Sequence, residues 1–279
     1  MIKLFAADLD GTLLNVLHLT DRTILRSLRE IRSAGAHFSI ATGRTLRSNR
    51  AMGFEGNVAV VCANGSLVLD EDGQVIRTAT MPHEFVEALV RAFPKAPLDF
   101  ITAEHTYHLG TEEQHAASFG NMPAWRKVVM RGMSMTGGPE HIYECAPAQV
   151  AALDVCKVNA HVKGMEEAGE VAAFIADWGD DVVNAPFNPS MLEVTRRGVN
   201  KGEAVAWLAS YLGISEDEVA VYGDGGNDIQ MLERFAGHGH AYATSNGSDA
   251  AKAAAGHVIG PCALHAVPHH MLRTLRKGR

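Results

Sequence analysis

Residues 4–14 read LFAADLDGTLL, a short apolar run that stops at two aspartates one residue apart. An apolar run of this length suits a buried parallel strand better than a helix. The two-residue period of a strand predicts that the carboxylates of Asp8 and Asp10 point the same way, and Gly11 allows a sharp turn after them. Ligands of doubly wound sheets bind beyond the carboxyl ends of the strands, so we expect a site here.

The pattern then alternates between helix and strand. Apolar residues recur at helical spacing after Thr20, the predicted N-cap, and a strand over residues 37–41 follows. A third strand is expected over residues 58–62, and the turn composition of residues 70–73 predicts a hairpin at the sheet edge. This order predicts an α/β fold with a doubly wound, Rossmann-like parallel sheet.

Residues 83–185 interrupt that pattern with short strands, helices and a loop-rich middle that contains residues 137–139. The core pattern is expected to resume with a strand over residues 191–195. We therefore predict a catalytic core of residues 1–82 and 186–279, and an inserted α+β cap domain of residues 83–185.

Composition bounds the function. The 279 residues are 47% hydrophobic and 20% charged, with a formal net charge of −7, which is typical of a folded globular protein. An acidic chain predicts neither a nucleic-acid nor an anionic-membrane surface. No apolar run approaches the roughly 20 residues of a membrane span, and the four cysteines form no C-x-x-C pair. We expect a cytoplasmic protein, either a monomer or a small homo-oligomer.

A second acidic loop, Gly223-Asp224-Gly225-Gly226-Asn227-Asp228, follows an apolar strand and begins a helix. Carboxylates without histidine or cysteine among them suit a hard cation, Mg²⁺ before Zn²⁺. A glycine-rich turn with a capping acid is the simpler alternative. A calcium-binding EF-hand is disfavoured, because the loop that begins at Asp8 has Leu13 where glycine is needed and a strand in place of the preceding helix.

Other polar residues suit a phosphate ligand. The second strand ends at Thr42, whose hydroxyl can donate to a phosphate oxygen together with the Gly43 amide, and Arg44 follows. Lys201 begins a helix, where the helix dipole disfavours a cation, so a specific role is suspected. A common strand-to-helix turn and a solvated surface lysine are the alternatives for these residues.

Taken together, these residues resemble the four motifs of the haloacid dehalogenase (HAD) superfamily, in the same order. Asp8-x-Asp10-Gly11-Thr12 resembles the first motif, Thr42 the second, Lys201 the third and residues 223–228 the fourth. The position of the insertion is similar to that in Cof-type phosphatases, which carry a C2B cap. The resemblance implies a Mg²⁺-dependent phosphatase that acts on small phosphorylated metabolites, with sugar phosphates as the leading class.

The resemblance also implies roles in catalysis. Asp8 would attack phosphorus and become an aspartyl phosphate, and Asp10 would protonate the leaving oxygen and then activate water. Mg²⁺ would be held by the Asp8 carboxylate, the backbone carbonyl of Asp10 and Asp224, with Asp228 close by.

The same resemblance implies how the phosphoryl group is held. Thr42, the Gly43 amide and Lys201 would bind its oxygens and so take part in catalysis. Asn227 would bind phosphate or orient Asp8, and Arg44 would reach the substrate.

Three other functions compete with this one. A phosphomutase of the phosphomannomutase type shares the core motifs and cap. A catalytically idle phosphate-binding regulatory protein is disfavoured because Asp8 is present. An ATP-binding kinase is disfavoured because no glycine-rich phosphate-binding fingerprint follows the first strand. None of the fourteen histidines has the spacing that marks a zinc site, and His105, Tyr107 and His108 of the cap are candidates to face the substrate.

Overall fold

The computed structural model describes residues 1–119, 140–186 and 190–277, so the predicted loop at residues 137–139 lies outside the described residues. Contacts divide the chain into two units. The first unit, the core, is Met1–Arg77 with Asn200–Arg279, and the second, the cap, is Thr78–Val199. The first segment of the core therefore ends at Arg77, where the sequence predicted residue 82, and the second segment begins at Asn200, where the sequence predicted residue 186.

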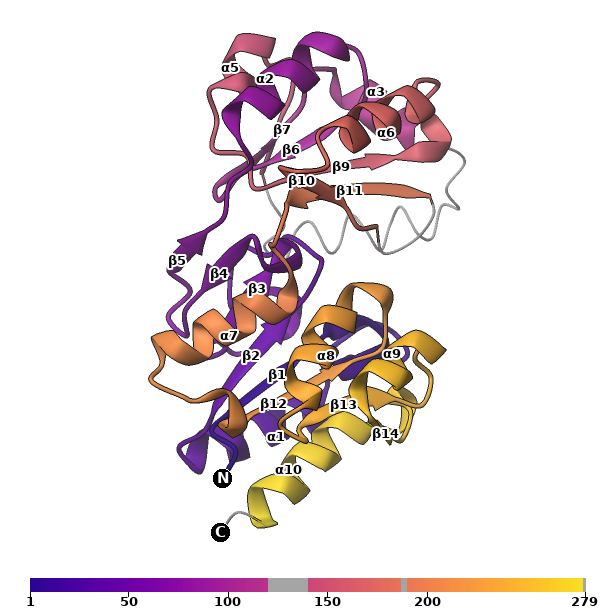
Figure 1. The fold of residues 1–279 in the computed structure, drawn as a ribbon. Helices are drawn as coiled ribbons and strands as arrows, with labels where there is room; N and C mark the ends of the chain where they lie inside the picture. The colour runs from indigo at the N-terminus through magenta and orange to yellow at the C-terminus, as the bar shows by residue number, and fades with distance from the viewer. Residues whose placement is uncertain (120–139, 187–189, 278–279) are drawn as a thin grey trace. The chain divides into compact units, whose positions relative to one another are not determined.

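The core contains an eight-stranded sheet with the order β14-β13-β12-β1-β2-β3-β4-β5 (Figure 1). The strands from β14 to β3 pair in parallel, and β4 is antiparallel to β3. This confirms the predicted parallel sheet and its edge hairpin, β4–β5. The bounds are β1 (Leu4–Ala7), β2 (His37–Ala41), β3 (Ala59–Cys62), β4 (Leu67–Leu69), β5 (Val75–Thr78), β12 (Val219–Gly223), β13 (Ala241–Thr244) and β14 (His257–Ile259).

Helices flank this sheet. One apolar cluster joins alternate strand residues, such as Leu4 and Val221, to α7 (Lys201–Tyr211), α8 (Ile229–Ala236) and α9 (Asp249–Ala255). The buried residues of α1 (Arg22–Ser33) lie outside that cluster, and α1 packs against α10 (Ala266–Lys277) (Figure 1). The arrangement is that of a doubly wound sheet.

The start of α1 differs from the prediction by one residue. Asp21, not Thr20, is the N-cap, and its carboxylate accepts hydrogen bonds from the amides of Thr23 and Ile24. Thr20 instead donates to the backbone oxygen of Met52. A carboxylate at the N-cap also suits the positive end of the helix dipole.

Strand register brings three polar turns to one edge of the core sheet. Ala7 of β1 lies opposite both Tyr222 of β12 and Ile40 of β2. Because these strands are parallel, the residues that follow them leave the sheet side by side. Asp8, Thr42 and Asp224 are therefore neighbours although they are far apart in the sequence.

The cap contains a six-stranded sheet with the order β10-β11-β9-β6-β7-β8. Its apolar cluster unites α2, α6 and alternate strand residues such as Phe100 and Val158, so both helices cover one face of this sheet. The bounds of its strands are β6 (Asp99–Ile101), β7 (His105–Tyr107), β8 (Glu140–Ile142), β9 (Lys157–His161), β10 (Val182–Asn184) and β11 (Met191–Arg196). Its helices are α2 (His83–Ala92), α3 (Glu112–Ser118), α5 (Pro147–Ala151) and α6 (Ala168–Asp177).

The assignment of residues 191–195 to the core is wrong. The strand exists as β11, but it pairs antiparallel with β9 and β10 of the cap sheet. Leu192 and Val194 are buried in the apolar cluster of the cap. Alternating hydrophobicity predicts a strand and its buried face but contains no information about the partner strand, which explains the error.

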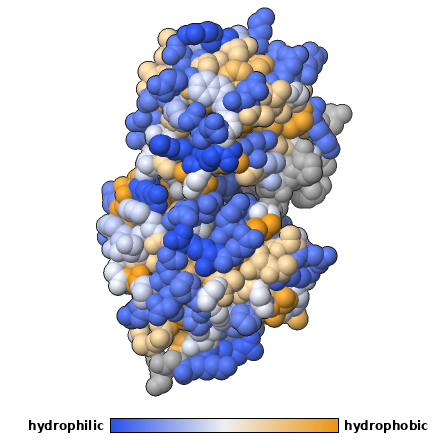
Figure 2. Space-filling model, viewed as in Figure 1, coloured by the Kyte–Doolittle hydropathy of each residue, from blue (hydrophilic) through white to orange (hydrophobic). Residues whose placement is uncertain are grey.

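The surface agrees with the charged composition. Hydrophobic residues are scattered among hydrophilic ones on the face in view (Figure 2). Across the described ranges, no helix is long and apolar enough to cross a membrane. Three of the four cysteines are buried.

Candidate active site

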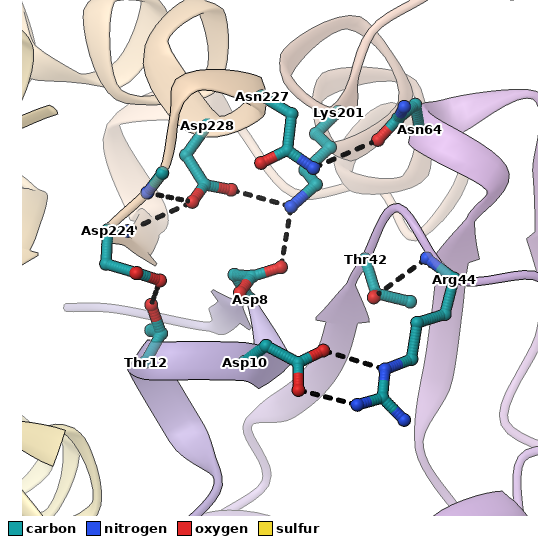
Figure 3. Close-up of polar contacts among 11 residues, drawn as sticks. Asp8, Asp10, Thr12, Thr42, Arg44, Asn64, Lys201, Asp224, Asn227 and Asp228 are labelled. Atoms are coloured by element: carbon teal, nitrogen blue, oxygen red, sulfur yellow. Dashed lines mark hydrogen bonds and ion pairs between the residues drawn. The ribbon is translucent and has the colours of Figure 1, made fainter. Parts of the chain in front are cut away.

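A buried ion-pair network lies at the carboxyl edge of the core sheet. The Nζ atom of Lys201 donates to Oδ1 of Asp8 at 2.6 Å and to Oδ1 of Asp228 at 2.7 Å (Figure 3). Lys201 begins α7 and is completely buried. The two carboxylates explain why a cation is tolerated at this helix end, because they offset both its desolvation and the unfavourable dipole.

Asp224 and Asp228 are held by the turn between β12 and α8. Oδ2 of Asp228 accepts hydrogen bonds from the amides of Asp224 and Gly225, both at 2.9 Å. The hydroxyl of Thr12 donates to Oδ1 of Asp224 at 2.6 Å (Figure 3). The carboxylate oxygens of Asp8, Asp224 and Asp228 thus come within 4.8 Å of one another.

This crowding shifts proton affinities. Burial, together with the charge of Asp228, raises the pKa of Asp8 to about 8, although Lys201 opposes the shift. Burial also raises the pKa of Asp224 to about 6, against the hydrogen bond from Thr12. Burial disfavours the charged form of Lys201, but Asp228 and Asp8 nevertheless raise its pKa above the ordinary value. The site therefore has more negative charge than one lysine compensates.

This excess of negative charge shows whether the residues suit a metal ion. Three carboxylates cluster here, and two of them, Asp8 and Asp224, have raised pKa values, so the group gains from a hard divalent cation that favours the charged forms. All the side chains in this group offer oxygen, the donor preferred by Mg²⁺. The residues fit a divalent metal.

Asp10 has other partners. Arg44 forms a bidentate pair with its carboxylate, with Nε 2.7 Å from Oδ2 and Nη2 2.6 Å from Oδ1 (Figure 3). His18 Nδ1 lies 2.7 Å from the same Oδ1 atom. Burial opposes the charged form, but the hydrogen bonds and charges of Arg44 and His18 hold the pKa of Asp10 below its usual range.

The expected alignment of the Asp8 and Asp10 carboxylates differs from the structure. Strand β1 ends at Ala7, and a turn over Leu9–Leu13 follows, in which Asp10 and Gly11 have non-helical backbone angles. The strand period therefore does not continue to Asp10. This carboxylate pairs with Arg44 and is not part of the acidic group of Asp8, Asp224 and Asp228.

The strand end of β2 supplies neutral polar groups. Thr42 is buried, and its hydroxyl oxygen accepts a hydrogen bond from the amide of Arg44 at 3.1 Å. The side-chain amide of Asn227 donates to Oδ1 of Asn64 at 3.2 Å. A Cβ atom on Gly43 would lie 2.8 Å from Oδ1 of Asn64 and 3.0 Å from Nδ2 of Asn227, so a larger residue here would displace these two amide side chains.

Gly11 is required by both its conformation and its surroundings. Its φ of +80° lies in the left-handed region, and a Cβ atom there would collide with the carboxylate of Asp224. The Gly11 carbonyl accepts hydrogen bonds from Asn246 at 2.8 Å and from Thr244 at 3.2 Å. The turn after β1 is thus fastened to the loop after β13.

Comparisons with known proteins give the family. Residues 5–271 match the haloacid dehalogenase-like hydrolase family, and the chain belongs to this family. The chain is 26% identical over 262 residues to a 5-amino-6-(5-phospho-D-ribitylamino)uracil phosphatase of Bacillus subtilis, covering 89% of this chain and 88% of the relative. It is 26% identical over 289 residues to an HMP-PP phosphatase of Klebsiella pneumoniae, covering 99% and 96%.

A solved structure agrees in fold. The solved structure of another protein, an HAD subclass IIB sugar phosphatase, superposes on this chain with a TM-score of 0.73 at 21% identity, covering 98% of each chain. The predicted membership of the Cof-type HAD family, the α/β fold with a cap, and the enzyme class, a phosphatase, are confirmed.

The structure brings nearly all the predicted site residues to one edge. Asp8, Asp224, Asp228 and Lys201 form one group (Figure 3). Thr42 and Gly43 follow the neighbouring strand β2, and the side chain of Asn227, from the turn after β12, comes close to Gly43. No role is predicted for Thr12, His18 or Asn64 from the sequence. Thr12 and Asn64 were detectable, because both lie in turns that follow predicted strands, whereas nothing local distinguished His18.

Proposed function

We propose that this phosphatase hydrolyses small phosphorylated metabolites, sugar phosphates foremost, with Mg²⁺ and through an aspartyl phosphate on Asp8. The observation that carries the proposal is the ion pair between the buried Asp8 carboxylate and Lys201, beside two further carboxylates. A solvent-shielded carboxylate next to a cation suits nucleophilic attack on an anionic phosphate.

In the first step, an Asp8 carboxylate oxygen attacks phosphorus. The bond from phosphorus to the ester oxygen breaks, and Asp10, which must enter this step in its protonated form, gives that oxygen its proton and releases the alcohol. In the second step, Asp10 takes a proton from water, which attacks phosphorus. The acyl phosphate bond breaks, inorganic phosphate leaves and the Asp8 carboxylate is restored. Arg44 and His18 orient Asp10 for both steps.

The phosphoryl oxygens are held by the groups around Asp8. Lys201 supplies positive charge, the Thr42 hydroxyl and the Gly43 amide donate hydrogen bonds, and Asn227 binds phosphate or orients Asp8. Arg44 is directed to Asp10, so we now propose a positioning role for it in place of direct substrate contact.

Mg²⁺ would be held by the carboxylates of Asp8 and Asp224 and the backbone carbonyl of Asp10, with Asp228 nearby. When bound, it supplies positive charge that lowers repulsion between the phosphate and Asp8. Asp228 has a second task, because it fixes the turn that carries Asp224.

The proposal is tested by phosphate release from a panel of substrates, with Mg²⁺ or with EDTA. The panel contains sugar phosphates, nucleotides, an aryl phosphate and the two substrates named for the relatives, 5-amino-6-(5-phospho-D-ribitylamino)uracil and HMP-PP. Wild type is compared with Asp8→Asn, and Asp72→Asn is the matched control because Asp72 is exposed in the β4–β5 turn.

We expect Mg²⁺-dependent release that Asp8→Asn abolishes and Asp72→Asn retains, with a sugar phosphate as the best substrate. Conversion of a hexose 1-phosphate to its 6-phosphate without phosphate release would establish a mutase instead. Substrate binding without turnover of any panel member would favour the idle phosphate-binding protein.

A further inference from the structure

A second cluster of metal-ligating side chains lies within the cap, separate from the residues of the proposed mechanism. His108, His115 and His141 offer ring nitrogens that lie within 4.8 Å of one another. Nε2 of His108 is 2.7 Å from Nδ1 of His141. His108 is buried, and the side chain of His115 is only 12% exposed.

Three elements of the cap contribute these rings. His108 directly follows β7, His141 is the central residue of β8, and His115 lies on α3. Strands β7 and β8 are parallel neighbours, with His141 opposite Thr106. His108 is two residues beyond Thr106, so side-chain alternation places it on the same face of the sheet.

A carboxylate orients two of the rings. Oδ1 of Asp99 lies 3.3 Å from Nδ1 of His108 and 3.1 Å from Nε2 of His115. An ionised carboxylate only accepts, so a neutral ring that donates to Asp99 from the nearer nitrogen has its opposite nitrogen available to a metal. Metal-binding histidines show this arrangement, in which a carboxylate fixes the tautomer and the orientation of the ring.

The spacing of the rings suits a transition metal. Two nitrogens bound to one tetrahedral Zn²⁺ at about 2.0–2.1 Å are separated by roughly 3.3 Å. The nitrogens of His108 and His141 lie at a hydrogen-bond distance of 2.7 Å, so a bound ion would replace this hydrogen bond and separate the two nitrogens by about 0.6 Å more. Imidazole is a good ligand for Zn²⁺ and a poor one for Mg²⁺ or Ca²⁺, which distinguishes this cluster from the acidic group of the core.

We propose that His108, His115 and His141 bind one Zn²⁺ ion in the cap, with Asp99 as the carboxylate that orients His108 and His115. The ion joins α3 to the β7–β8 edge of the cap sheet and stabilises that edge. Such binding is independent of phosphate chemistry in the core, since no residue is shared between the two sites.

The test is titration of the full-length, metal-free protein with Zn²⁺ by calorimetry, in excess Mg²⁺ so that the acidic group of the core is already saturated. Variants are His141→Ala, the milder His141→Gln and Asp99→Asn. His83→Ala is the matched control, because His83 is an exposed cap histidine outside the cluster. Co²⁺ in place of Zn²⁺ provides a visible absorption spectrum that reports tetrahedral coordination.

We expect one equivalent of Zn²⁺ and a tetrahedral Co²⁺ spectrum for wild type and His83→Ala. Both signals are lost in the two His141 variants, and Asp99→Asn weakens binding by about 10- to 100-fold. Zn²⁺ also raises the unfolding temperature of wild type but not of His141→Gln.

Two results would overturn the proposal. One is the lack of a tetrahedral Co²⁺ spectrum in wild-type protein, which does not depend on the folding of any variant. The other is equal Zn²⁺ affinity in wild type and the His141 variants. Phosphate release with Mg²⁺, measured in parallel, is the separate test of the proposed function and does not decide this one.

Discussion

The Nζ atom of Lys201 lies 2.6 Å from Oδ1 of Asp8, although 193 positions separate the two residues in the chain. Both side chains are buried, and the cap lies between them in sequence. The contact couples the end of β1 to the start of α7, so the core is completed only when its two sequence segments pair. The same contact places a cation beside the proposed nucleophile.

Replacement of Lys201 by Met removes the cation and leaves two carboxylates buried without it. We expect the free energy of unfolding to fall by about 3–5 kcal/mol, as when one partner of a buried ion pair is lost. We also expect kcat to fall by roughly 10²–10³-fold, as when a charge-stabilising donor is removed.

Denaturant unfolding and steady-state kinetics measure both effects. Lys95→Met is the matched control, because Lys95 is exposed. Wild-type stability in Lys201→Met would contradict the importance of the buried network.

The bidentate pair between Arg44 and Asp10 predicts a pH effect. Arg44 helps to keep the pKa of Asp10 low against burial, so Arg44→Lys, which loses the planar fork, raises that pKa. Asp10 must be ionised to activate water. As pH is lowered, the rate of aspartyl-phosphate hydrolysis therefore begins to fall at a higher pH in the variant than in wild type. Single-turnover kinetics across pH measure this shift, and Arg26→Lys, at an exposed arginine, serves as the control. Superimposable profiles would refute the positioning role.

The raised pKa values of Asp8, about 8, and Asp224, about 6, predict how stability depends on pH. In the metal-free folded protein these groups hold protons that the unfolded chain releases near the ordinary value of 3.8. Stability is therefore complete below that value and is lost as pH rises through about 6 and about 8. Mg²⁺ competes with the protons, so its stabilising effect grows over the same interval.

Thermal unfolding across pH, with EDTA or with Mg²⁺, tests this prediction. In Asp8→Asn the loss of stability at high pH becomes smaller, because the group with the higher pKa is absent. A stabilisation by Mg²⁺ that is the same on both sides of this interval would show that protons and metal do not compete.

Gly11 and Gly35 both have a left-handed backbone, so comparing their alanine variants distinguishes the cost of backbone strain from the effect of a clash with Asp224. Gly11 and Gly35 have φ values of +80° and +77°, but only Gly11 has the Asp224 carboxylate where a Cβ atom would be. Both Gly→Ala variants are expected to lose roughly 1–2 kcal/mol of stability from the backbone alone. Only Gly11→Ala is also expected to lose Mg²⁺ affinity and activity, measured by calorimetry and phosphate release. Equal activity in the two variants would show that the turn adapts.

Local sequence was sufficient for much of the fold and the site. The apolar runs before Asp8 and Asp224 predicted buried strands, and the rule that ligands bind beyond parallel strand ends predicted that these acids gather. The residues of the four motifs lie directly after strands or at helix starts, so their positions follow from short-range patterns. The unfavourable place of Lys201 at a helix start singles it out in the same way, and the structure shows it buried and paired with Asp8 and Asp228.

Tertiary structure decided what depends on pairing between distant segments. Strand periodicity identified residues 191–195 as a strand, but only backbone hydrogen bonds to β9 and β10 assigned it to the cap. The attachment of Arg44 to Asp10, and the meeting of His108 with His141, likewise depend on how strands and turns align. Side-chain chemistry and local periodicity are properties of the sequence itself, whereas the partner of each charged or polar group is set by long-range register and packing.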